Sequence, residues 1–224
     1  MNFTEQAFIE MFPGKGVPPI SVSYSGKFKM YNANVRRTPF GLHFNLSKEW
    51  RKIDDSIKMG LIQSLLGKVY KTKVQTTNID LYNNFTKHIH ISIPKTKTDE
   101  ILKQAFDRVN EKYFNGQVEL TNLVWGSPNK RTLGTYSYHT DTIAVSSIFK
   151  DCPQIFIDYV MYHEILHKKI KFYSKNGKNY HHTSEFREKE KEFENHKVVD
   201  HELKNYISRK RIVRKKPKTN WWFW

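Results

Sequence analysis

The feature of this sequence that most constrains its fold is an apolar stretch near residue 160. In a helix, its large side chains would cover every side, which is the pattern of a helix buried in a core. Asp151 or Cys152 is expected to open this helix, with Pro153 in its first turn. The apolar residues are Ile155, Phe156, Ile157, Tyr159, Val160, Met161, Tyr162, Ile165 and Leu166.

Three polar residues interrupt this apolar helix: His163, Glu164 and His167. Residues four apart lie one above the other on a helix, so both imidazoles can reach one metal ion, and Glu164 lies beside them. This is the HExxH pattern, in which Zn²⁺ lowers the pKa of its water to about 7 and the glutamate takes the proton as general base. The hydroxide then attacks a peptide carbonyl.

The alternative is that both histidines are hydrogen-bonded core residues and that Glu164 is a surface charge. Burying two imidazoles and a carboxylate on one helical turn without a metal is costly, which favours the metal site. The pattern therefore predicts one catalytic zinc ion, with His163 and His167 as ligands and Glu164 as the base.

The rest of the sequence restricts the kind of zinc site. Cys152 is the only cysteine, which excludes a disulfide and a cysteine-rich zinc ribbon. The metzincin extension requires Gly and His where this chain has Ile170 and Tyr173, so that class is excluded as well. A third protein ligand must come from elsewhere, and the next histidines are His181 and His182.

The segment His182-Thr183-Ser184-Glu185-Phe186 resembles the His-x-x-x-Phe segment that follows HExxH in SprT-like (Spartan-type) zinc metallopeptidases. Earlier segments are similar to the helix and small sheet of that domain, in the same order. The likeness spans about residues 98 to 195. Those earlier segments are 110–116, 124–126, 133–135 and 143–146.

The resemblance implies an α+β fold, in which a small three-stranded sheet packs against the zinc-binding HExxH helix and a following helix. It also implies that His182 is the third ligand beside His163 and His167, with His181 and a glutamate, Glu185 or Glu188, as alternatives. The run of glutamates from 185 to 194 alternates with lysines and is interpreted as a solvated helix face.

Three regions are expected along the chain. Residues 1–95 form an additional N-terminal α+β region of unknown role, 96–203 the SprT-like metallopeptidase domain, and 204–224 a basic tail that ends in aromatic residues. Spacing predicts helices over about 47–69 and 101–113, the latter ending near Asn115-Gly116, and strands at 118–125, 132–138 and 142–146. Strict alternation predicts a strand over 88–93 with His88 and His90 on its polar face.

The chain is strongly basic, with 38 Lys and Arg against 22 Asp and Glu, giving a net charge of +16. Its last 21 residues carry eight basic residues and no acidic one. Such a segment can follow a phosphate backbone while Trp221 to Trp224 stack on exposed bases; the alternative is a solvated polycation or a membrane-surface anchor. The predicted nucleic-acid-binding residues are Arg209, Lys210, Arg211, Arg214, Lys215, Lys216 and Lys218.

These observations predict a zinc metalloendopeptidase that acts on protein substrates. The resemblance to Spartan-type peptidases implies, together with the basic charge, that DNA-bound or DNA-crosslinked proteins are candidate substrates. One alternative is a DNA-binding or regulatory protein with a structural or inactive metal site. Another is a metallopeptidase held at a membrane surface. The start of the sequence lacks the pattern of a secretory signal, so we expect an intracellular protein, cytoplasmic or nucleoid-associated, and a monomer.

Overall fold

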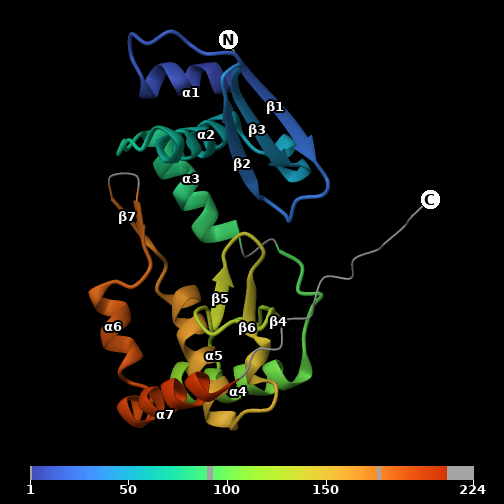
Figure 1. The fold of residues 1–224 in the computed structure, drawn as a ribbon, viewed down its shortest axis with the longest axis vertical. Helices are drawn as coiled ribbons and strands as arrows, with labels where there is room; N and C mark the ends of the chain where they lie inside the picture. The colour runs from blue at the N-terminus through green and yellow to red at the C-terminus, as the bar shows by residue number, and fades with distance from the viewer. Residues whose placement is uncertain (1, 90–92, 176–177, 211–224) are drawn as a thin grey trace, which may run out of the picture.

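The computed structural model describes residues 2–89, 93–175 and 178–210, and it shows a mixed α+β chain with two hydrophobic cores (Figure 1). One core is built from residues before 90 and the other from residues after 100. Among the described residues the two cores share no side chain, which agrees with an N-terminal region that packs by itself. The predicted domain boundaries themselves stay a prediction.

The N-terminal region places helices α1 and α2 against a three-stranded sheet in the order β1-β3-β2, with β1 parallel and β2 antiparallel to β3. Trp50, Phe44 and Ile62 are fully buried at its centre. The elements are α1 (Phe3–Met11), β1 (Ile20–Ser25), β2 (Ala33–Thr38), β3 (Gly41–Ser47), a 3-10 turn (Lys48–Lys52), α2 (Asp55–Tyr70) and α3 (Thr77–His88).

The C-terminal region packs α4 and α5 against a second sheet in the order β4-β6-β5, with β4 parallel and β5 antiparallel to β6. This confirms the predicted small three-stranded sheet beside the apolar helix. The elements are α4 (Glu100–Phe114), β4 (Asn122–Gly126), β5 (Gly134–Ser137), β6 (Thr142–Ser146), a 3-10 turn (Ser147–Phe149), α5 (Gln154–Lys169), β7 (Tyr173–Lys175), β8 (Lys178–Tyr180), α6 (Ser184–Glu190) and α7 (His196–Arg209).

The apolar helix is α5, and its hydrophobic side chains are buried on nearly every side, as predicted. Pro153 is its N-cap residue, not a residue of its first turn. α4 ends at Asn115 and Gly116, both with positive φ, which confirms the predicted end of that helix.

A buried ionic network joins the end of α5 to the β5–β6 turn. The Asp141 carboxylate is fully buried and accepts hydrogen bonds from the Tyr136 hydroxyl at 2.7 Å and from the Lys168 ammonium at 3.1 Å, and it also pairs with Lys95. Because buried charges need such partners, this network fixes the edge strand β5 relative to α5.

Two further predictions of local structure were wrong. His88 lies in the last turn of α3 and not in a strand: Thr76 caps that helix, and the His88 ring bonds the Asn84 carbonyl at 2.9 Å, which extends the helix through His88. The strand prediction at 90–92 lies outside the described residues. The helix expected from Ser47 begins at Asp55, because Ile53 is extended and the Asp54 carboxylate caps Ser56.

None of the helices in the described part of the chain is long and apolar enough to cross a membrane.

Candidate metal centre

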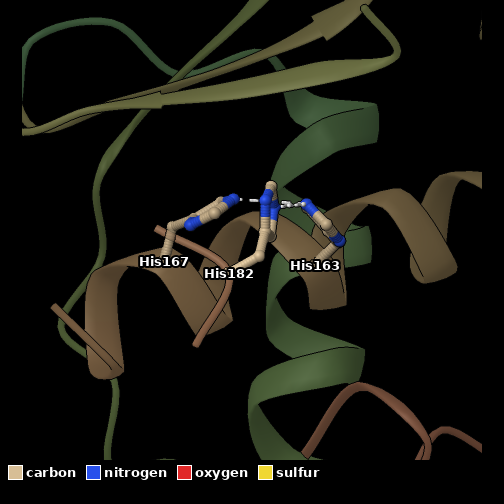
Figure 2. Close-up of side chains that lie close together, drawn as sticks. All are labelled: His163, His167 and His182. Carbon is tan, nitrogen blue, oxygen red and sulfur yellow. Dashed lines mark hydrogen bonds between the residues drawn. The ribbon is translucent and has the colours of Figure 1, made fainter. Parts of the chain in front are cut away.

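Three imidazoles converge at one point beside α5 (Figure 2). His163 and His167 come from adjacent turns of α5, and His182 comes from the segment between β8 and α6. The Nε2 atom of His163 lies 3.2 Å from that of His167 and 3.3 Å from that of His182. The described residues bring these three predicted ligands together, each with one nitrogen within 4.8 Å of the others.

The spacing of these nitrogens fits a zinc ion. Two nitrogens bound tetrahedrally to Zn²⁺ at about 2.0 to 2.1 Å must lie about 3.3 Å apart. The separations from His163 to both partners match this value. The three nitrogens can therefore serve together as ligands of one zinc ion.

The Nδ1 atom of His163 is held by Glu190, which leaves its Nε2 atom facing the other two rings. Its Nδ1 lies 2.7 Å from Glu190 Oε1, and an ionised carboxylate accepts, so Nδ1 is the donor. In the neutral ring Nε2 then keeps its lone pair and points at the centre. The hydrogen bond from His163 holds the pKa of Glu190 below its usual range, which keeps the acceptor charged.

Glu190 is a site residue that the sequence analysis missed, because it was assigned to a solvated face. A signal was present: Glu190 lies four residues after Phe186, so the two share a face of α6. Phe186 is fully buried and its ring contacts His163, His167 and His182. The face of α6 that carries Phe186 therefore meets the metal centre.

Burial favours the neutral form of His167 and His182, which is the form that binds a metal. Burial lowers the pKa of His167 to about 3, with neighbouring imidazoles adding to the effect. The pKa of His182 is also lowered, first by burial and then by His163. The Nδ1 atom of His167 is buried and has no hydrogen-bond partner in the described residues.

Glu164 lies beside the histidines and is almost completely buried. Burial raises the pKa of its carboxyl to about 7, against the opposing effects of His163 and of the Tyr136 backbone N–H that bonds it. Its Oε2 atom is buried and finds no hydrogen-bond partner in the described part of the chain. A group with these properties can accept a proton near neutral pH and release it again.

The edge strand β5 leaves room for this carboxylate at Gly134. A Cβ atom at that position would come within 2.5 Å of Glu164 Oε1. Gly134, Glu164 and the three histidines line one cavity of about 580 Å³, together with Tyr138, Asn179 and Tyr180. The cavity is large enough for a polypeptide segment to reach the histidines.

The alternative third ligands are less well placed than His182. His181 lines the same cavity, but its ring packs near Phe172 and Tyr138, at centroid distances of 5.5 and 6.2 Å, and it is not one of the three converging residues. Glu185 is exposed, and Glu188 pairs with Lys191 at 3.0 Å. The geometry therefore favours His182, whose role as a ligand stays a prediction.

Comparison with known families gives one match in this region. Residues 102–208 match the model of the SprT-like family. This part of the chain is thus similar to that family. The match supports a metallopeptidase, and it covers all three histidines, Glu164 and Glu190.

Other comparisons give only distant likenesses, and no curated protein matches the chain. The crystal structure of the metallopeptidase zymogen jannalysin of Methanocaldococcus jannaschii is 20% identical with a TM-score of 0.35, over 48% of this chain and 95% of that one. The zymogen abylysin of Pyrococcus abyssi is 16% identical with a TM-score of 0.38, over 50% of this chain and 99% of that one. Neither likeness assigns an activity.

The predicted nucleic-acid-binding residues lie apart from this site in sequence, and most fall outside the described residues. Arg209 ends α7 and Lys210 is its C-cap, with its ammonium 5.0 Å from the centre of the Tyr206 ring. α7 spans the predicted boundary at 203/204. The residues outside the described part are Arg211, Arg214, Lys215, Lys216, Lys218 and the final aromatic residues.

Replacing Glu190 by glutamine should weaken zinc binding by about 10- to 100-fold, which is the usual effect of losing an outer partner of a metal-bound histidine. The amide removes the charge that orients the His163 ring. Competition with a fluorescent zinc chelator measures the change. Glu188→Gln on the same helix is the matched control, since Glu188 pairs with an exposed lysine; equal affinity of both variants would exclude the positioning role.

Proposed function

We propose that this chain is a zinc-dependent metalloendopeptidase. The observation that carries the proposal is the convergence of three Nε2 atoms beside a buried carboxylate in one cavity. His163, His167 and His182 would hold the ion, which supplies a Lewis acid that polarises a peptide carbonyl and makes water acidic enough to lose a proton near pH 7.

The chain's own residues supply proton transfer and orientation. Glu164 takes a proton from water at its unpartnered Oε2 atom and delivers it to the amine that leaves. A carboxyl whose pKa is about 7 suits both steps, because it is charged in part of the molecules and readily protonated. Glu190 keeps His163 in the required tautomer, and Gly134 leaves space for Glu164.

An inactive or purely structural metal site is the competing proposal. A structural site needs ligands and no base, and its four positions are usually all occupied by protein. Here the converging protein ligands in the described residues are three, and Glu164 stands beside them without a partner for Oε2. These features support the catalytic site.

As a secondary proposal, the substrates of this peptidase are proteins bound or crosslinked to DNA. The support is the net charge of +16 and the eight basic residues after position 203. The intracellular location and the monomeric state remain predictions. Salt-dependent binding to single-stranded DNA, with no binding to anionic vesicles, would separate this proposal from a membrane-surface peptidase.

Removal of zinc tests the proposed function. The protein treated with a chelator and dialysed should stop cutting an unfolded basic protein, and stoichiometric Zn²⁺ should restore cleavage while Mg²⁺ should not. The assay is run with and without single-stranded DNA. Cleavage that survives complete zinc removal would contradict the proposal, whereas zinc-dependent cleavage that DNA leaves unchanged would argue only against DNA-bound substrates.

A further inference from the structure

A second cavity of about 570 Å³ lies between the N-terminal region and the SprT-like region. One wall comes from α2 and α3, and the other comes from the β5–β6 turn and the β7–β8 hairpin. Figure 1 shows this hairpin rising from the C-terminal half alongside α3. The two halves of the chain thus enclose a space that neither forms alone.

This second cavity adjoins the cavity at the candidate metal centre. Four residues line both of them: Tyr138, Asn179, Tyr180 and His181. One space therefore lies at the converging histidines and the neighbouring one lies against α2 and α3. A polypeptide that occupies both spaces, with a peptide bond at the converging histidines, meets the N-terminal region.

The walls of the second cavity mix polar and apolar side chains and carry little charge. Lys68 is the one Lys or Arg in the described lining, and no Asp or Glu lines the described part of the cavity. The ammonium of Lys68 lies close enough to His139 to depress the pKa of that buried imidazole further, after burial itself. The other polar lining residues are Gln63, Ser64, Thr72, Asn83 and Thr86.

Two polar atoms in the walls of this cavity, His139 Nε2 and Thr86 Oγ1, are buried without a hydrogen bond of normal geometry to another described residue, although the Thr86 hydroxyl lies near that of Tyr82. Because both atoms are buried, they do not face the open space of the cavity. The exposed Lys68 is the cation of the lining, and it suits a ligand that offers a carboxylate.

We propose that this second cavity binds the substrate polypeptide away from the cleaved bond, and that the N-terminal region selects an extended segment bearing an acidic side chain. The choice of occupant rests on the proposed peptidase function. A nucleic acid is less suitable, because phosphate backbones are held by several cations and this cavity offers one. The N-terminal region is then a specificity element of the enzyme.

A binding experiment tests this inference without relying on cleavage. The probes are fluorescein-labelled peptide pools of about 12 residues, which span about 40 Å when extended, with either three Asp or three Lys toward one end. All proteins carry Glu164→Gln, so that the peptides are not cut. Lys68→Glu and the control Lys52→Glu are added singly, and fluorescence anisotropy measures affinity.

The Asp-bearing pool should bind the Glu164→Gln protein more tightly than the Lys-bearing pool. Lys68→Glu should weaken binding of the Asp-bearing pool by about fivefold and reverse the preference. Lys52→Glu, an exposed lysine that also lies in the last turn of a helix and does not line the cavity, should have no effect.

Several outcomes would overturn the inference. Equal affinity of the Lys68→Glu and Lys52→Glu proteins for the Asp-bearing pool would remove the cavity from substrate binding. Displacement of the peptide by single-stranded DNA in a manner that depends on Lys68 would assign the cavity to nucleic acid instead. Failure of the proposed peptidase function is a separate result, since it is seen as absent cleavage by the wild-type protein.

Discussion

Replacing His182 by alanine should abolish stable zinc binding. Zinc sites with four ligands bind with about 10–16 kcal/mol, so the loss of one ligand is expected to weaken binding by about 10²- to 10³-fold. This exceeds the effect expected at Glu190, which contacts a ligand and not the ion. His182 is exposed, so alanine should leave the fold intact.

His181→Ala is the matched control for this experiment. His181 is adjacent in sequence, but its ring packs toward Phe172 and Tyr138. Zinc content after dialysis, measured by atomic absorption, should fall in His182→Ala and stay at one ion per chain in His181→Ala. The opposite pattern would assign the third ligand to His181.

Replacing Glu164 by glutamine should lower the rate of peptide cleavage by about 10²- to 10⁴-fold, the usual contribution of a general base. Glutamine has nearly the same shape, cannot accept the proton from water at neutral pH, and is less costly to bury than a carboxylate. Since Glu164 is not one of the three converging residues, zinc content should not change. Glu185→Gln, an exposed carboxylate of α6, is the control and should cut normally.

Much of the metal centre could be predicted because its information is local. The spacing of His163 and His167 fixes their direction on one helix, and the apolar residues around them require that helix to be buried. Turn residues such as Asn115 and Gly116 also act locally, which is why the end of α4 was predicted correctly. The prediction of His182 came from the resemblance to a family. The structure places its ring beside those of His163 and His167.

What could not be predicted depends on contacts between distant segments. Glu190 belongs to a run of charges typical of a solvated face, and only the packing of Phe186 turns it toward His163. A strand was expected at His88 because a short alternation of apolar and polar residues is typical of a strand. In the structure, the helix that begins after Thr76 extends through His88. The cavity between the two halves could not be predicted, because residues from both halves line it and no local pattern in either half indicates it.

Side-by-side cleavage and zinc measurements on the wild-type and Glu164→Gln proteins test the central claim most directly. An unfolded basic protein serves as substrate, and the zinc content of the same preparations is determined. We predict one zinc ion per chain in both proteins, with cleavage by the wild type and at least about a hundredfold slower cleavage by Glu164→Gln. Equal cleavage by two proteins with equal zinc content would contradict the account.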